Sequence, residues 1–356
     1  MTVFDVNMTA QNGHAAGEFA ARSGPCQKNT LVKNIAFKSA HQTTLNDHVR
    51  LEGIGVHSGN PSCIILHPAK SGSGISFLRR AEGNGIDQLI PAHVSHVGDT
   101  RLCTVLGDPE DLYVATVEHL LAALRGMNVD NVLIEIDAAE VPVMDGSSRA
   151  FVEAIRKVGT RKQAAPRRYI RVLRQVEASH GKARALLRPH DGTRFDIEID
   201  FESEAIGHQR FITELTPEVF ARDISRARTF GFLAEAKQLR AMGLAQGSSF
   251  DNSVVIDEDR VLNAEGLRYE DEFVRHKLLD AIGDLALAGS QILGEYKSVC
   301  GGHKLNSMIL KALFADEENW CYEDAIPSEE RGLYSTPVGA PVGLEAASQP
   351  VAAAKA

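Results

Sequence analysis

Apolar and polar positions alternate along much of the chain with two different periods. Residues 49–59 and 62–69 show the two-residue alternation of half-buried strands, and they flank a Ser-Gly-Asn-Pro turn at 58–61. The strand pattern returns briefly at residues 102–106 and more fully at 128–137. These segments predict a hairpin and two further strands in the first half of the chain.

Helical spacing replaces the strand pattern in two other segments of the first half. Thr116 precedes one of them, and we expect its side chain to cap the helix. Apolar residues then recur at intervals of three and four, at Val117, Leu120, Leu121 and Leu124. Residues 147–159 form a second amphipathic pattern, which predicts a second helix.

The second half of the chain repeats this order of elements. Strand patterns occur at residues 169–179 and 194–201, and helical patterns follow at 217–224, 233–242 and 271–287. Because strands and helices come in a similar order in both halves, we predict an α+β fold with two similar domains.

Segments without sustained periodicity set the expected domain boundaries. Residues 1–43, rich in Ala, Gly, Asn, Gln and Thr, predict a flexible N-terminal extension, and residues 327–356 predict a flexible C-terminal tail. The basic, proline-containing stretch at 160–168 is expected to link domain I, residues 44–162, to domain II, residues 168–326.

Composition narrows the class of protein. A length of 356 residues agrees with two domains at about 150 residues each. The net charge of −9 argues against a general nucleic-acid binder, which needs a basic face. The five cysteines are scattered without a CxxC motif, and we see neither a secretory signal nor an apolar stretch of membrane-spanning length. We therefore expect a cytoplasmic protein without stable membrane insertion.

One helical segment carries a possible metal site. His276, Asp280 and Asp284 follow one another at intervals of four, so they share one helix face. A histidine and a carboxylate one turn apart can both reach one Zn²⁺. An isolated pattern of this kind is more often a solvated polar face, and by itself it does not identify a metal site.

Three further segments carry residues suited to catalysis. Glu118 and His119 lie in the first turn of a predicted helix, where an acidic residue and a helix-end histidine are also ordinary. His303 follows two glycines and could act as an acid or base near neutral pH, although a loop histidine taken alone is usually a surface residue. Thr229 follows Arg226 and Arg228, whose guanidinium groups suit phosphate, although an exposed strand end would look the same.

Together these segments resemble one family, the zinc-dependent UDP-3-O-acyl-N-acetylglucosamine deacetylases of lipid A synthesis. The resemblance covers about residues 44–323 in unbroken order. It rests on Gly-Ile-Gly-Val-His-Ser-Gly at 53–59, Asp-Thr-Arg-Leu-Cys-Thr at 99–104, Thr-Val-Glu-His at 116–119, Val-Pro-Val-Met-Asp-Gly-Ser-Ser at 141–148, Ser-Arg-Ala-Arg-Thr-Phe-Gly-Phe at 225–232 and the helix at 272–284 that closes in Ile-Gly-Asp.

The resemblance implies a metal site with one catalytic Zn²⁺ per chain. His119, His276 and Asp280 match its ligands, and three protein ligands leave an open position for water. Glu118 matches the general base that takes the proton of that water.

Other matching residues have roles in proton transfer and charge stabilisation. His303 matches the histidine that protonates the leaving amine, and Asp284 the partner that orients it. Thr229 matches a hydroxyl on the oxyanion side, and Lys277 a lysine that faces phosphate.

The resemblance also implies where the substrate lies. Each half of such an enzyme is a sheet packed with two helices plus an insert, and the active site lies at the interface of the halves. Asp200 and Phe201 fall where the family binds uracil, and an insert near 231–255 is expected to form a passage for the acyl chain. The residues predicted to contact the substrate in this insert and next to it are Phe230, Leu239, Met242, Leu244, Phe250 and Val255. Ala236 and Ala245 are smaller than the side chains of relatives at these positions, which leaves the preferred acyl length open. Cys300 stands where relatives can carry a basic residue, which leaves the phosphate contacts open.

Two other functions agree with the same residues. One is a zinc deacetylase of another nucleotide-linked N-acyl sugar, and the other is a catalytically silent nucleotide-sugar-binding protein. A structural zinc site closes with a fourth protein ligand and has no need of Glu118, Thr229 and His303, which disfavours the silent protein. A zinc peptidase is disfavoured because the chain has no HExxH motif. We expect a monomer acting on an acylated UDP-sugar.

Overall fold

The computed structural model describes residues 40–80 and 86–325. The predicted C-terminal tail, and residues 1–39 of the predicted N-terminal extension, lie outside these ranges. In the described part of the chain, no helix is long and apolar enough to span a membrane.

The first half forms a five-stranded sheet in the order β2 (Val49–Ile54), β3 (Pro61–Pro68), β9 (Val132–Ile136), β4 (Ile75–Arg79) and β5 (Gln88–Pro91). Strands β2 and β3 are antiparallel, as expected for the predicted hairpin, and β9 lies within the strand predicted at 128–137. Only the β4–β9 pair is parallel.

The second half repeats this pairing. Its strands follow in the order β12 (Val176–His180), β13 (Ala183–Arg188), β19 (Gln291–Val299), β14 (Thr193–Asp200) and β15 (His208–Glu214). Again the pair formed by the fourth strand and the central strand, β14–β19, is parallel, and the others are antiparallel. The same five-strand topology in both halves confirms the α+β fold of two similar domains.

Two additional strands lengthen the second sheet. The segment predicted as one strand at 169–179 is two, β11 (Arg168–Val172) and β12. Strand β11 pairs with the start of β19 and with β20 (Trp320–Asp324).

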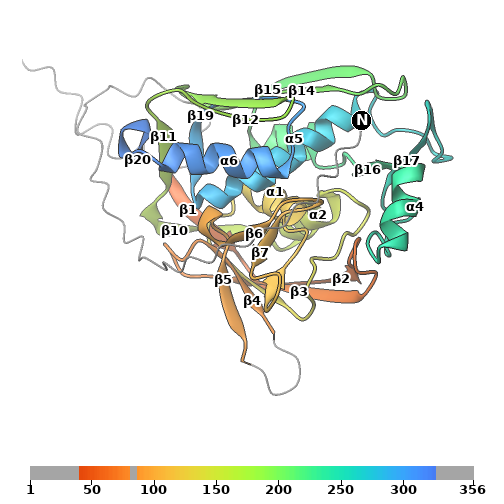
Figure 1. Cartoon of the computed structure of the whole chain (residues 1–356). Helices are drawn as coiled ribbons and strands as arrows, with labels where there is room; N and C mark the ends of the chain where they lie inside the picture. Colours follow the sequence, from red (N-terminus) through yellow and green to blue (C-terminus); the bar gives the residue numbers. More distant parts are fainter. Residues whose placement is uncertain (1–39, 81–85, 326–356) are drawn as a thin grey trace, which may run out of the picture.

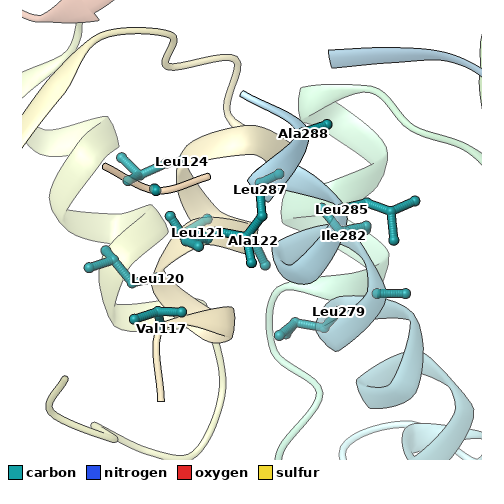
Figure 2. Close-up of a cluster of buried hydrophobic side chains, with 14 of the residues drawn as sticks. Val117, Leu120, Leu121, Ala122, Leu124, Leu279, Ile282, Leu285, Leu287 and Ala288 are labelled. Carbon is teal, nitrogen blue, oxygen red and sulfur yellow. The ribbon is translucent and has the colours of Figure 1, made fainter. Parts of the chain in front are cut away.

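Helices from both halves lie between the two sheets (Figure 1). They are α1 (Glu118–Gly126) and α2 (Arg149–Val158) from the first half and α5 (Glu272–Leu285) and α6 (His303–Phe314) from the second. Leu121 and Ala122 of α1 lie against Ile282 of α5 and Leu287 just beyond it, all of them buried (Figure 2). Burying a side chain such as leucine or isoleucine contributes about 1.5–3 kcal/mol, so this contact joins the halves into one core.

Each half carries an insert, which lies between β5 and α1 in the first half and between β15 and α5 in the second. The first contains β6 (Val97–Asp99), β7 (Val105–Gly107) and β8 (Tyr113–Val114), so the strand predicted at 102–106 starts only at Val105. The second contains β16 (Phe230–Phe232), α4 (Leu233–Ala241), β17 (Val254–Asp257) and β18 (Arg260–Val261). Short helical turns complete the described structure: Val94–His96, α3 (Pro217–Val219) continuing into Phe220–Ile224, Ala286–Ala288 and Glu317–Asn319.

The stretch at 160–168, predicted as a linker between the halves, is strand over most of its length. Residues Thr160–Pro166 form strand β10, which pairs antiparallel with β1 (His41–Leu45). Residues 41–43, assigned to the flexible extension, are therefore also part of a strand. The proline ends β10 and does not interrupt it, because this two-stranded ribbon needs no hydrogen-bond donor from its last residue.

Candidate metal centre and active site

Three predicted metal ligands meet where α1 and α5 cross. His119 is the second residue of α1, and His276 and Asp280 lie one turn apart on α5. Asp280 Oδ1 lies 3.5 Å from His119 Nε2 and 3.4 Å from His276 Nε2. All three side chains are buried, and their candidate ligand atoms lie within 4.8 Å of one another.

The hydrogen bonds around this triad suit a cation at its centre. His276 Nδ1 donates to the Ala227 carbonyl at 3.1 Å, which leaves the Nε2 lone pair for a metal. Lys277 Nζ donates to Asp280 Oδ2 at 2.8 Å, while Asp280 Oδ1 is buried without a hydrogen-bond partner among the described residues. An unpaired carboxylate oxygen facing two imidazole nitrogens fits a bound divalent ion.

Electrostatics keep these ligands in their metal-binding forms. Burial lowers the pKa of His276 to about 3, so its imidazole is neutral. Burial by itself would raise the pKa of Asp280, but His276 and Lys277 hold it well below its ordinary value. A neutral histidine and an ionised carboxylate are the forms that bind metals.

A glycine sets how closely α1 and α5 approach. A Cβ atom on Gly283 would lie 1.9 Å from the Glu118 carbonyl oxygen, closer than any real contact. The helices can therefore bring His119 to Asp280 only if residue 283 has no side chain. This contact explains the glycine in the Ile-Gly-Asp motif.

A second cluster of predicted residues lies beside the triad. His303, the first residue of α6, places Nδ1 2.9 Å from Asp284 Oδ2 and Nε2 3.7 Å from Glu118 Oε1. Burial opposes protonation of His303, yet Asp284 and Glu118 raise its pKa to about 9. Burial also raises the pKa of Glu118, which His303 and His119 partly offset. The cluster therefore holds a charged imidazolium between two carboxylates.

Two polar residues that the sequence did not single out complete this cluster. Thr104 Oγ1 donates to Asp284 Oδ1 at 2.6 Å, and Asn306 Nδ2 donates to Asp284 Oδ2 at 2.8 Å. The Thr104 backbone N–H also donates to Glu118 Oε2 at 3.1 Å. Thr104 belongs to one of the family-like motifs, but nothing in that motif indicates contacts with helices far along the chain.

Glu140 is another buried carboxylate that sequence patterns did not indicate. It accepts hydrogen bonds from the backbone N–H groups of His57 and Ser58, the Ser58 hydroxyl and the Thr116 hydroxyl, at 2.7–2.9 Å. Thr116 is held at φ 57°, and Val117 occupies the cap position of α1 without a side-chain hydrogen bond. The prediction that Thr116 caps the helix is therefore wrong, because its hydroxyl is engaged by Glu140.

The arginines before Thr229 differ from each other. Arg226 is exposed, whereas Arg228 is fully buried and bonds Glu272 at the start of α5 at 2.9 Å. Its guanidinium also donates to Glu265 and to the Gly266 carbonyl. Arg228 therefore joins the strand segment to α5 and is not available for phosphate.

The predicted substrate residues all belong to the second half of the chain. Thr229 is half-buried, its N–H bonded to the Gly146 carbonyl. Phe230 stacks edge-on with Phe201 at 5.8 Å and lies 6.1 Å from the His276 ring, which brings both aromatic residues toward the metal triad. Asp200 ends β14 and is exposed. In the second insert, Met242 and Phe250 are exposed and Leu239, Leu244 and Val255 half-buried.

Comparisons with known proteins identify the family of this chain. Residues 42–315 match the family model described as UDP-3-O-acyl N-acetylglycosamine deacetylase. Proteins of Brucella ovis, Brucella canis and Brucella melitensis, each named UDP-3-O-acyl-N-acetylglucosamine deacetylase, are 48% identical over 282 residues, which is 78% of this chain and 97% of each relative. On both grounds, this chain belongs to the UDP-3-O-acyl N-acetylglycosamine deacetylase family.

Proposed function

We propose that this enzyme hydrolyses the N-acetyl group of UDP-3-O-[(R)-3-hydroxyacyl]-N-acetylglucosamine. The products are acetate and the free 2-amine of the sugar, in the committed step of lipid A synthesis. The observation that carries the proposal is the presence of two clusters, a triad suited to a metal and a histidine held between two carboxylates, which are joined by the adjacent residues His119 and Glu118 at the start of α1. Amides are poor electrophiles, so a hydrolase of this kind needs both an activated water and a proton donor.

His119, His276 and Asp280 are the residues that we assign to one Zn²⁺ per chain. Two imidazole nitrogens and a carboxylate oxygen suit zinc and leave a position open. When bound, zinc would supply a water of lowered pKa and polarise the amide carbonyl. Lys277 holds the outer oxygen of Asp280, so only Oδ1 faces the ligand position.

Glu118 and His303 make the two proton transfers of the reaction. The Glu118 carboxylate takes a proton from the attacking water, which then forms the new C–O bond to the acetyl carbon. The imidazolium of His303 donates its Nε2 proton to the sugar nitrogen as the C–N bond breaks, so the amine leaves neutral. Asp284 accepts from His303 Nδ1 and keeps the ring charged and oriented.

The remaining assignments concern the substrate and the cell. We assign Thr229 to the oxyanion and Lys277 to a phosphate. Asp200 and Phe201 are assigned to uracil, and Phe230, Leu239, Met242, Leu244, Phe250 and Val255 to the acyl chain. We further propose domains at 44–162 and 168–326, a monomer and a cytoplasmic location, the last from the scattered cysteines.

Acetate release from the acylated UDP-sugar, with and without a strong chelator, tests the function. We expect turnover that the chelator abolishes and that limiting Zn²⁺ restores. Full turnover in a verified metal-free preparation would contradict the mechanism. Comparable turnover of UDP-N-acetylglucosamine, which has no acyl chain, would contradict the substrate assignment, and binding without acetate release would indicate a silent binding protein.

A further inference from the structure

Thr104 touches both carboxylates that flank His303. It lies in the loop before β7, in the insert of the first half, and it is 2% exposed. Its hydroxyl bonds Asp284 on α5 and its backbone N–H bonds Glu118 on α1. One residue of the insert thus reaches a helix from each half.

The hydroxyl of Thr104 decides which oxygen of Asp284 serves the histidine. Thr104 Oγ1 occupies Asp284 Oδ1, so Oδ2 is left to accept from His303 Nδ1 at 2.9 Å. Asn306 also donates to Oδ2, and the Tyr296 hydroxyl donates to the Asn306 side-chain oxygen, which fixes the orientation of that amide. Both oxygens of this buried carboxylate are therefore assigned, and its plane has no freedom to rotate without losing a bond.

The backbone of Thr104 constrains Glu118 in the same way. Its N–H engages Glu118 Oε2, which leaves Oε1 as the oxygen nearest His303 Nε2 at 3.7 Å. Asp284 Oδ2 and Glu118 Oε1 then face opposite nitrogens of one imidazole ring. A buried carboxylate that lost its donor would rotate to recover a hydrogen bond and would turn the ring with it.

We propose that Thr104 is a positioning residue, which with Asn306 sets the orientation of the Glu118–His303–Asp284 cluster. This inference rests on the proposed function and adds a role for the first insert, which supplies no residue of the metal triad. We expect zinc affinity and substrate binding to be independent of Thr104, because its hydroxyl bonds Asp284 and its N–H bonds Glu118, and neither belongs to the triad.

The test compares Thr104→Val with Thr104→Ser. Valine has the shape of threonine without the hydroxyl, and serine keeps the hydroxyl, while both keep the N–H that bonds Glu118. The loss of a hydrogen bond to a buried charged group of this kind corresponds to about 10- to 100-fold. We expect that loss in the kcat of Thr104→Val, with an unchanged KM and zinc content, and a kcat close to wild type in Thr104→Ser.

Thr44→Val is the matched control. Thr44 lies in β1, away from the site, and is also fully buried. Its hydroxyl donates to the Asn131 carbonyl at 2.6 Å. The Thr44→Val substitution should lower the midpoint of thermal unfolding without lowering kcat. A wild-type kcat in Thr104→Val, an equal loss in Thr104→Ser, or a loss of zinc would each overturn the proposal.

Asn306→Ala provides a second route if Thr104→Val does not fold. It removes the other fixed donor to Asp284, and we expect a lower kcat and an upfield shift of the hydrogen-bonded His303 Nδ1 proton in the NMR spectrum. An unchanged kcat and resonance would overturn the proposal. A wild-type enzyme without acetate release would instead contradict the proposed function, so the two failures can be told apart.

Discussion

The two clusters of the site use the same residue types to opposite electrostatic effect. His276 and His303 are both close to buried carboxylates, but the pKa of His276 is lowered to about 3 and that of His303 is raised to about 9. Beside His276, Lys277 already engages the nearby carboxylate of Asp280, and a second imidazole lies 5.0 Å away. His303 has a carboxylate on each side, Glu118 near Nε2 and Asp284 near Nδ1.

This difference indicates how one site can separate two roles. Burial favours the neutral imidazole, which binds a metal, unless unneutralised carboxylates outweigh it. The lysine that follows His276 and the second carboxylate beside His303 are therefore as important as the histidines. The predictions below test whether the two clusters are separate in function.

The largest effect is expected from the metal triad. His119→Ala removes one of the three predicted ligands, so zinc content should fall far below one per chain and acetate release should fall to background. His67→Ala, in a histidine–glutamate pair on the first sheet, should retain both properties. Retention of stoichiometric zinc by His119→Ala would contradict the ligand assignment.

His303→Gln should affect turnover but not the metal. Glutamine keeps a polar side chain but cannot carry the proton, and loss of a general acid costs about 10²- to 10⁴-fold in kcat. Zinc content, measured on the same preparation, should remain at the wild-type level. If zinc were lost together with activity, the separation of the two clusters would be wrong.

The pH dependence should follow His303. The acid form is present below its pKa of about 9, so kcat should fall as the pH rises through that value. The same sign applies to stability: the contribution of this charge is complete below pH 6.5, the ordinary value, and is lost as the pH rises through about 9. Asp284→Asn removes the larger raising partner and should move the alkaline limb down by about 1 to 3 pH units. An unmoved limb would show that another group controls it.

Gly283→Ala should have a smaller effect on both clusters. The added Cβ meets the Glu118 carbonyl, and overpacking of this kind costs about 1–3 kcal/mol in the free energy of unfolding. Gly231→Ala is the matched control, since a Cβ there meets open space. Urea denaturation of both variants measures the difference, and equal midpoints would mean that α1 and α5 separate without cost.

Local periodicity predicted much of the fold and of the site. The four-residue spacing of His276, Asp280 and Asp284 placed them on one face of a real helix, and the repeated order of elements anticipated the repeated sheet topology. The structure brings His119 and Glu118 to that face, while their roles stay predictions. These properties depend on residues close in sequence or on a resemblance that spans the chain.

What the sequence did not reveal depends on contacts between distant segments. Strand β10 looked like a linker because its partner β1 lies more than a hundred residues earlier. The Thr104 contact with Asp284 and the burial of Arg228 against Glu272 likewise join separate elements. A threonine or an arginine has no local pattern that distinguishes an exposed side chain from one that bonds a buried carboxylate.

The most direct test of the two-cluster account is Glu118→Gln, with zinc content and acetate release measured on one preparation. Glu118 adjoins the predicted ligand His119 but belongs to the other cluster, so the account predicts about one zinc per chain and a kcat lower by about 10²- to 10⁴-fold. A normal kcat, or a loss of zinc in parallel with activity, would contradict it.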